Sequence, residues 1–240
     1  DHRSLTATAT APNPDVELVQ RALELLAAEA DGFSLTGGVL FPLTEPIKAR
    51  THERLPATVD ADAFLVALDG SGALAPVTLD IRTEAGPFGV SNLLSLLPVQ
   101  GIPLKPRTAY AAVVRRSLGL ARSEAVAALL NGESPKGLAD PTALHDALSE
   151  LRNLGVDTTE VAALTVFTTG DPAAEMVAAR ESILALPRPT LAPFEAREVF
   201  DTFCVYESKV DMPVFQAGEP PFSTDGGGWI WSQNELVQQG

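Results

Sequence analysis

The sequence is poor in the residues from which disulfides and zinc sites are built. Its 240 residues include one cysteine, Cys204, so no disulfide can form within the chain. It has three histidines, and no Cys and His residues have the spacing typical of a zinc site. We therefore predict no metal site from these residues and expect Cys204 to be a small buried hydrophobic residue.

Positively charged residues are also scarce. Lys and Arg number 17 against 31 Asp and Glu, which gives a formal net charge of −14 at pH 7. Nucleic-acid phosphates and anionic membrane surfaces are bound by cationic patches. The charge balance therefore argues against both as partners, and we expect the negative charge to favour solubility.

Long hydrophobic runs are missing as well. No stretch approaches the roughly 18 apolar residues that span a bilayer, and the apolar run 92–99 has the length of a strand. No transmembrane segment is predicted. Residues 1–14 are polar and interrupted by proline, so we expect a flexible N-terminus there.

Hydrophobic residues nevertheless make up 45% of the chain, enough for one large domain or two small ones. The first periodic segment is 15–30, which follows the helix-starting pair Asn13-Pro14. Its apolar residues recur every three or four positions, as in an amphipathic helix. We predict an N-terminal helix with a buried stripe that includes Val19 and Leu26.

Short apolar segments with a period of two follow, separated by Pro, Gly and Asp. They are 39–43, 63–68, 77–82, 93–99 and 108–115. Such segments are typical of the strands of a β-sandwich. In the clearest, Val77, Leu79 and Ile81 are predicted to point into the core. The residues between them, Asp80 included, are predicted to face water.

A proline-rich turn leads into the last of these strands, near Tyr110. At such a corner of an immunoglobulin-like sandwich, a tyrosine often forms a hydrogen bond to nearby backbone and fixes the turn. We therefore predict that Tyr110 is a structural corner residue. An ordinary core tyrosine at the start of a strand is the alternative.

Helical patterns interrupt the strands between about 121 and 155. Ser123-Glu124 begins one short helix, and Asp140-Pro141 begins a second with Leu144, Leu148 and Leu151 on its buried side. A strand is predicted at 163–169. A further helix follows Asp171-Pro172 and reaches Leu186, with Met176, Ala179 and Ile183 in its stripe.

The fold predicted from these patterns is mainly β: an immunoglobulin-like β-sandwich over 15–186, with the N-terminal helix and the helical insertion. Prolines at 187, 189 and 193 indicate a linker. Residues 187–240 are predicted to be this linker and a strand-rich extension. Two strands, 198–206 and 209–215, are expected there with a turn at Glu207-Ser208.

The search for catalytic residues finds none. A hydrolase nucleophile of the Gly-x-Ser-x-Gly type is missing, and no histidine adjoins a Ser, Cys or Asp arrangement that suggests a relay. An enzyme that works through the carboxylates of Glu198, Asp201 and Asp211 remains an alternative.

Calcium is the one cofactor that the sequence leaves open. Asp60 with Asp62, or Asp69 beside Gly70, could supply oxygen ligands, but the twelve-residue calcium loop is absent. Roles in turns and in solubility are the alternative for these residues.

Two tryptophans lie close to each other near the end of the sequence. Trp229 and Trp231 share one face if the segment is extended. They could form an aromatic platform for a sugar or a lipid, or an interdomain contact. The alternative is packing against another part of the same polypeptide.

Several pieces of the chain, taken in order, resemble the amino-terminal region of bacterial extracellular lipases of the virulence-factor type and of related myxobacterial exported α/β hydrolases. The pieces are 30–34, Phe41 with 45–47, 103–110 and 166–169. Together they cover about residues 30–169. The resemblance implies a non-catalytic immunoglobulin-like domain that precedes a hydrolase domain, and none of the catalytic residues of that domain is present in this sequence.

The resemblance sets the functional expectation. It implies a secreted, periplasmic or outer-surface bacterial protein whose hydrolase domain, on the same polypeptide, is the partner of this region. The region would orient or shield the hydrolase entrance, or hold a lipid or ester substrate near it. A surface adhesin or assembly module is a further alternative, alongside the carboxylate-dependent hydrolase.

Overall fold

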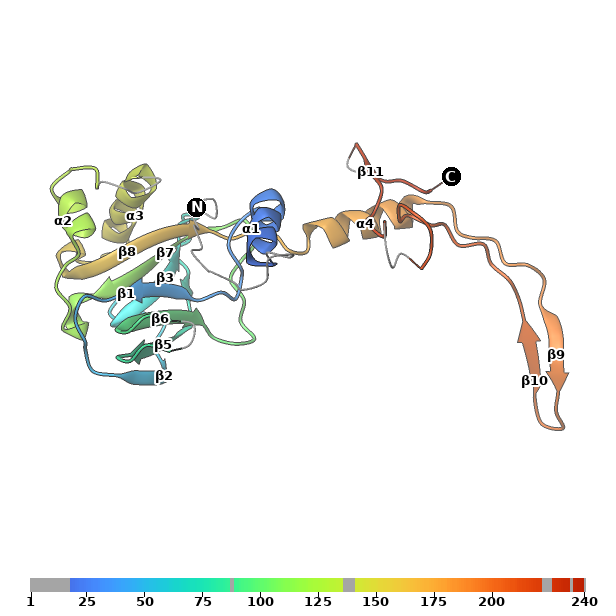
Figure 1. Cartoon of the computed structure of the whole chain (residues 1–240), viewed down its shortest axis with the longest axis horizontal. Helices are drawn as coiled ribbons and strands as arrows, with labels where there is room; N and C mark the ends of the chain where they lie inside the picture. Colours follow the sequence, from blue (N-terminus) through green and yellow to red (C-terminus); the bar gives the residue numbers. More distant parts are fainter. Residues whose placement is uncertain (1–17, 87–88, 136–140, 222–225, 234, 240) are drawn as a thin grey trace. The chain divides into compact units, whose positions relative to one another are not determined.

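The computed structural model describes residues 18–86, 89–135, 141–221, 226–233 and 235–239 (Figure 1). The predicted flexible segment 1–14 lies outside these residues, as do Asn13-Pro14 and Asp140. The chain forms two compact units, Asp1–Asp171 and Pro172–Gly240. Strands hold 30% of the described residues and helices 24%, so the fold is mainly β, and its main sheets are antiparallel.

The first unit contains two four-stranded antiparallel sheets. The first sheet has the order β1-β6-β5-β2, with β1 at Val39–Pro42, β2 at Arg50–Arg54, β5 at Val77–Arg82 and β6 at Leu93–Pro98. The second has the order β4-β3-β7-β8, with β3 at Ala63–Ala67, β4 at Leu74–Ala75, β7 at Ala109–Arg115 and β8 at Val161–Thr168.

The two sheets share one hydrophobic core. Leu65 of β3 and Val114 of β7 belong to the same buried cluster as Leu79 of β5 and Leu96 of β6. Alternation along each strand produces this core, because every second side chain points to the same face. The five strands predicted between 39 and 115 are confirmed within one residue at each end.

Two strands of these sheets were not predicted from the sequence. β2 reads Arg-Thr-His-Glu-Arg and has no apolar side chain, and β4 is only two residues long. Neither carries a period-two apolar signal. β2 occupies the edge of the first sheet beside β5 and is almost entirely exposed, which explains its charged composition.

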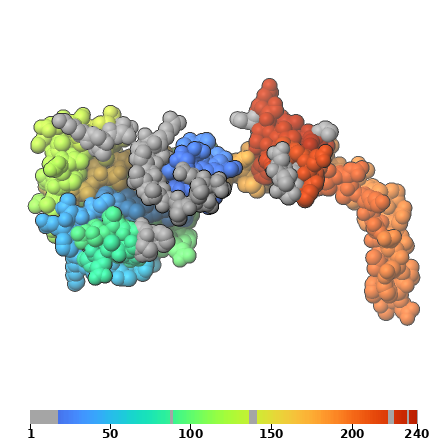
Figure 2. Space-filling view, viewed as in Figure 1, coloured from blue at the N-terminus to red at the C-terminus, as the bar shows by residue number. Residues whose placement is uncertain are grey.

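Helices cover the outer face of the second sheet. α2 (Glu124–Leu130) and α3 (Pro141–Asn153) form the yellow-green layer in Figures 1 and 2. Leu148 and Leu151 of α3 pack in one buried cluster with Phe64 of β3 and Val113 of β7. The helical insertion and its apolar stripe are therefore confirmed, and they form the third layer of the unit. Single turns of 3-10 helix lie at Arg116–Leu118 and Thr158–Glu160.

Tyr110 joins the turn before β7 to the strand. Its side chain is buried, its hydroxyl accepts a hydrogen bond of 3.0 Å from the backbone N–H of Lys105, and its ring stacks on Phe167 at a centroid distance of 5.9 Å. The hydroxyl of Thr169 donates to the carbonyl of Lys105 at 2.6 Å. These bonds fix the backbone of Lys105 from two sides.

The N-terminal helix α1 spans Leu18–Glu29, but the predicted buried stripe is wrong. None of its described residues is buried, and both Val19 and Leu26 are more than two-fifths exposed. The segment that follows the helix, in contrast, is held by backbone pairing with the end of β8. Phe33 forms a parallel bridge with Thr169 there.

The second unit contains α4 (Ala174–Ala185), the hairpin β9 (Glu195–Val199) and β10 (Cys204–Glu207), and the short pair β11 (Trp231–Ser232) and β12 (Glu235–Leu236). The sequence placed α4 in the first domain, with the boundary at the prolines after it. The boundary falls after Asp171 instead, because α4 packs on β12, where Ser182 Oγ accepts a hydrogen bond from the backbone of Leu236.

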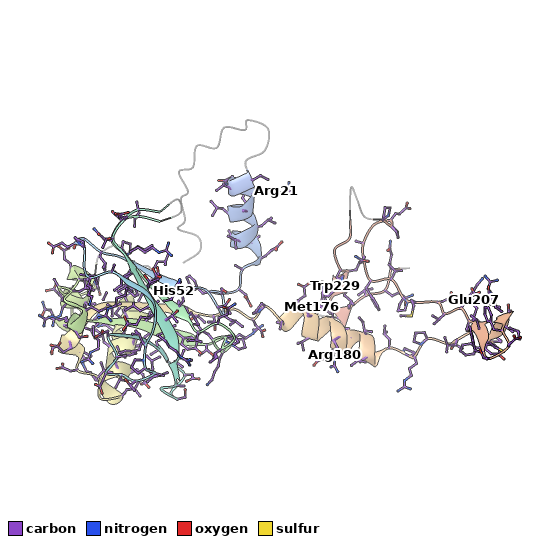
Figure 3. The ribbon with its side chains drawn as sticks, turned by 90° about the horizontal axis from the view of Figure 1, so that it is seen from below. Arg21, His52, Met176, Arg180, Glu207 and Trp229 are labelled. Atoms are coloured by element: carbon purple, nitrogen blue, oxygen red, sulfur yellow. The ribbon has the colours of Figure 1, made fainter. Side chains whose placement is uncertain are left out.

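The predicted stripe of α4 is also largely exposed. Ala179 is its one buried residue, and Met176 and Ile183 are 61% and 45% exposed. Figure 3 labels Met176 on the surface of this helix.

The hairpin differs from the two strands predicted over 198–215. Its turn lies between Phe200 and Phe203, whose rings stack at 4.5 Å and whose backbones are hydrogen-bonded, and not at Glu207-Ser208. Cys204 lies on β10 and is exposed, so the prediction of a buried thiol is wrong. The error has one cause: both strands of this hairpin are exposed throughout, so its apolar residues do not indicate burial.

None of the helices described combines the length and the apolar character that crossing a bilayer requires.

Candidate functional site

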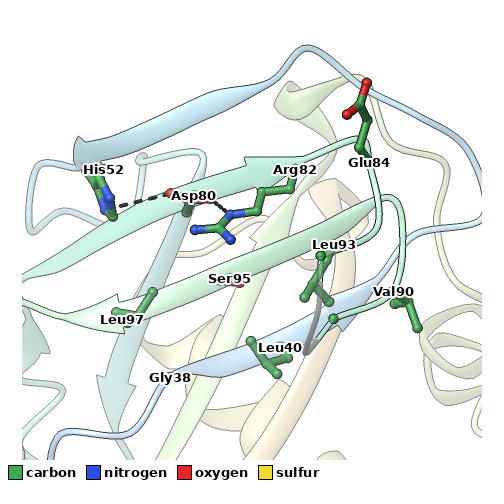
Figure 4. Close-up of a pocket in the computed structure, with 12 residues that line it drawn as sticks. Gly38, Leu40, His52, Asp80, Arg82, Glu84, Val90, Leu93, Ser95 and Leu97 are labelled. Carbon is green, nitrogen blue, oxygen red and sulfur yellow. Dashed lines mark hydrogen bonds and ion pairs between the residues drawn. The ribbon is translucent and has the colours of Figure 1, made fainter.

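A groove lies on the outer face of the first sheet (Figure 4). It has a volume of about 460 Å³ and is lined by residues of β1, β2, β5 and β6 and of the loop between β5 and β6. In the described part of the chain, the helices that pack on a sheet, α2 and α3, cover the second sheet. None of the helices described contributes a residue to the lining of the groove.

Four apolar side chains form one part of the groove. Leu40 of β1 and Val90 of the β5–β6 loop are 57% and 58% exposed, and Leu93 and Leu97 of β6 are half-buried beside them. Strand β6 reads Leu-Leu-Ser-Leu-Leu-Pro, so it is apolar on both faces. A strand with one face in water usually alternates apolar and polar residues. The outer face of β6 thus has the composition of a covered surface.

A buried carboxylate marks the polar end of the groove. Asp80 of β5 is 5% exposed, and its Oδ1 accepts a hydrogen bond of 3.0 Å from Nε of Arg82. Its Oδ2 is buried and has no hydrogen-bond partner in the described part of the protein; Nδ1 of His52 lies 3.7 Å from it. The prediction that Asp80 faces water is wrong, because β5 is a central strand and the neighbouring side chains cover the carboxylate.

A bulge in β2 places His52 beside this carboxylate. The pairing of β2 with β5 shifts by one residue between Arg50 and Glu53, and His52 adopts the left-handed backbone conformation with φ of 46°. Bulges bend a strand and redirect its side chains, and they are common beside functional sites. A non-glycine residue keeps a positive φ only where its surroundings fix it. Figure 3 labels His52 in the first unit, and Figure 4 shows it beside Asp80.

The groove contains a serine, a histidine and an aspartate, but they are not arranged as a hydrolytic relay. Ser95 is the one hydroxyl residue among the described residues that line it, and it lies directly opposite Asp80 on the neighbouring strand. The His52 side chain is 77% exposed, and at 3.7 Å from Asp80 it is beyond hydrogen-bond distance. In a relay, the nucleophile lies within hydrogen-bond distance of a base, and the base lies within hydrogen-bond distance of a group that orients it.

The tryptophan pair lies in the second unit, whereas the groove is lined by residues of the first. The rings of Trp229 and Trp231 are 6.0 Å apart and tilted by 59°, and both residues are half-buried. Nε1 of Trp231 donates a hydrogen bond of 3.1 Å to Glu175 of α4. The pair therefore contacts another part of the same polypeptide.

The three carboxylates of the alternative hydrolase lie in different elements. Glu198 is on β9, Asp201 follows that strand in the hairpin turn, and Asp211 adjoins the isolated bridge between Val210 and Leu191. All three are exposed. None of them lines the groove.

Protein donors occupy two of the carboxylates considered for calcium. Asp62 Oδ1 accepts from the Ser117 hydroxyl at 2.6 Å, and this bond lowers the pKa of Asp62. The Ser71 hydroxyl and N–H lower the pKa of Asp69 to about 2, with Lys105 assisting. Within the described residues, no group of three or more His, Cys, Asp or Glu side chains is placed to hold a metal ion.

Comparison of the chain with family models, with curated proteins and with solved structures finds no match. A proposal for the binding site therefore has to be based on the geometry of the groove. Sequence reasoning missed this site, although the apolar residues on both faces of β6 were a visible signal. The burial of Asp80 and the bulge at His52 depend on strand pairing and could not be read from the sequence.

Proposed function

We propose that this chain is a non-catalytic binding module, in which the first unit is the scaffold and the groove on its first sheet is the binding site. One observation carries the proposal: a partly apolar groove on the first sheet contains a buried carboxylate oxygen that has no hydrogen-bond partner among the described residues. Buried polar atoms in folded proteins are nearly always hydrogen-bonded, and exceptions call for an explanation. A bound ligand that donates to Asp80 supplies one.

The scaffold is best described, in this proposal, as a variant of the immunoglobulin-like sandwich. Numbered along the chain, β3, β7 and β8 correspond to strands C, F and G, and their order in the second sheet is the same. Tyr110 stands at the start of β7, where such domains have a corner tyrosine bonded to upstream backbone. The first sheet departs from the pattern: the order A-B-E-D would be β1-β2-β6-β5, whereas β2 lies on the far side of β5.

The biological setting is proposed from the resemblance to the amino-terminal regions of exported lipases. In that setting the unit stands beside a hydrolase domain of the same polypeptide, at the bacterial surface or outside the cell. Its groove would hold a lipid or ester near the hydrolase entrance. The apolar lining by Leu40, Leu93 and Leu97 supports a ligand of this kind.

Two leucines of similar exposure provide the test of the binding site. Leu40 is 57% exposed in the groove, and Leu184 is 65% exposed on α4. The neutral dye N-phenyl-1-naphthylamine should bind the purified chain and gain fluorescence. Leu40→Asp should weaken this binding by roughly tenfold or more, because a buried leucine contact contributes about 1.5–3 kcal/mol. Leu184→Asp should leave it unchanged.

Catalysis is tested on the same preparation. We expect no turnover of p-nitrophenyl esters and no labelling by a fluorophosphonate. Turnover that is lost in Glu198→Gln or Asp211→Asn would instead support the carboxylate-dependent hydrolase. Equal dye binding by the Leu40→Asp variant and the unchanged protein would overturn the groove as the binding site.

A further inference from the structure

We infer that the groove takes a single amphiphile with an alkyl chain and a neutral head that bears hydroxyl groups, of the monoacylglycerol type. The inference rests on the proposed function and names the ligand class of the same site. The alkyl chain would lie over Leu40, Leu93 and Leu97, and the head group would meet Asp80 and Arg82.

The size of the groove indicates one small molecule. Its volume of about 460 Å³ falls in the range of about 300–1,000 Å³ that is typical of small-molecule sites. A stable protein partner would require about 800 Å² of surface on each side, far more than a groove of this size provides. An extended alkyl chain needs only an apolar track, and the outward leucines of β1 and β6 form one.

The charges at the polar end favour a neutral head. Arg82 contributes one positive charge, and Asp80 and Glu84 contribute two negative charges. An anionic head would meet the two carboxylates, and a cationic head would meet the guanidinium. Hydroxyl groups both donate and accept hydrogen bonds, so neighbouring hydroxyls can satisfy both kinds of group at once.

The polar end of the groove offers one hydrogen-bond acceptor and one donor group to a head group. Asp80 Oδ2 is an acceptor without a donor in the described part of the chain, and Arg82 uses Nε to hold Oδ1. Figure 4 shows the guanidinium of Arg82 beside Asp80 at the groove. One head-group hydroxyl can donate to Oδ2 while its neighbour accepts from the guanidinium.

The route to Asp80 passes His52. Oδ2 is buried, and the side chain of His52, which is 77% exposed, lies 3.7 Å from it. An exposed imidazole without a full hydrogen bond to the carboxylate can swing aside at little cost, since rotamer changes of exposed side chains are fast. The head group would then replace His52 as the neighbour of Oδ2.

The test compares three amphiphiles with the same chain length. 1-Monooctanoylglycerol, octanoate and octylammonium are titrated into the full chain by calorimetry, below their micelle concentrations. We expect the glycerol ester to bind at least about tenfold more tightly than either charged amphiphile, because the wrong head leaves buried polar groups unpaired.

Variants assign the preference to the polar end. Asp80→Asn and, as a change on a more exposed side chain, Arg82→Gln should each reduce the affinity for the glycerol ester several-fold relative to the affinity for the dye. Arg180→Gln, on the surface of α4 (Figure 3), is the control and should change neither. Circular dichroism confirms that each variant is folded.

The outcomes separate the two proposals. If all three amphiphiles bind equally and Leu40→Asp removes them all, the groove is a binding site but the inferred head group is wrong. A preference for octanoate or octylammonium would also overturn the inference. If neither the dye nor any amphiphile binds, the proposed function itself fails.

Discussion

The two units of this chain differ most in how their apolar residues are used. In the first unit, apolar side chains fill a core between two sheets and a second cluster under α2 and α3. In the second, Ala179 and Leu236 are the buried apolar residues among those described, while residues such as Phe194 and Val199 are 65% and 74% exposed. Similar hydrophobic content therefore forms a self-contained core in the first unit and a largely exposed apolar surface in the second.

Leucine truncation gives the largest expected contrast between the units. Leu96→Ala, at a position with no exposure, should lower the free energy of unfolding of the first unit by about 2–5 kcal/mol. Leu191→Ala, at a second-unit position that is 56% exposed, should change the free energy of unfolding by less than about 0.5 kcal/mol.

Urea unfolding can follow the units separately. Both tryptophans of the chain, Trp229 and Trp231, lie in the second unit, so their fluorescence reports on that unit and circular dichroism reports on both. A loss of stability in Leu191→Ala as large as that in Leu96→Ala would contradict this difference between the units, because it would mean that the second unit also depends on a packed core.

The two tyrosines of the chain allow the contribution of one hydrogen bond to be compared between the units. Tyr110→Phe keeps the buried ring but leaves the N–H of Lys105 without its acceptor, so we expect a loss of about 1 kcal/mol in the stability of the first unit. Tyr206→Phe, on the exposed strand β10, is the matched control and should have no measurable effect. Equal urea midpoints for Tyr110→Phe and the unchanged protein would show that the corner bond contributes nothing.

The smallest expected effect concerns acid unfolding. The Ser117 hydroxyl lowers the pKa of Asp62, against the opposing effect of burial and with help from Arg50. Since the folded carboxyl holds a proton less tightly than the unfolded one, the stabilisation is complete above the ordinary Asp pKa of about 3.9 and is lost as the pH falls through the lowered value. Asp62→Asn should therefore flatten the fall of the melting temperature below about pH 4.

Asp211→Asn in the second unit serves as the control for this measurement. It should leave the shape of the melting curve against pH unchanged. A steep fall below pH 4 that persists in Asp62→Asn would show that other groups dominate the acid response of the first unit.

The sequence predicts the first unit well because its strands follow simple periodicity. Val77, Leu79 and Ile81 alternate with less buried or polar residues, and all three lie in the core. The exceptions have physical causes. β2 is a charged edge strand without an apolar side, and Asp80 is buried by neighbours that only the pairing of strands brings together.

The second unit was predicted less well because periodicity there does not mean burial. The stripe of α4 is mostly exposed, and the hairpin turn lies at the stacked pair Phe200 and Phe203 rather than at the polar pair chosen from the sequence. The candidate site was missed for a related reason. Its residues come from four strands and a loop, and no single segment carries its signature.

The charged composition of β2 affects how the protein associates with itself in concentrated solution. A strand from another molecule that paired with this edge would have to strip water from Glu53 and Arg54, which are charged and exposed. The β2 edge of the first sheet is thereby protected from pairing with a strand of another molecule. The apolar outer face of the sheet can remain open to ligands without making the protein prone to polymerise through that edge.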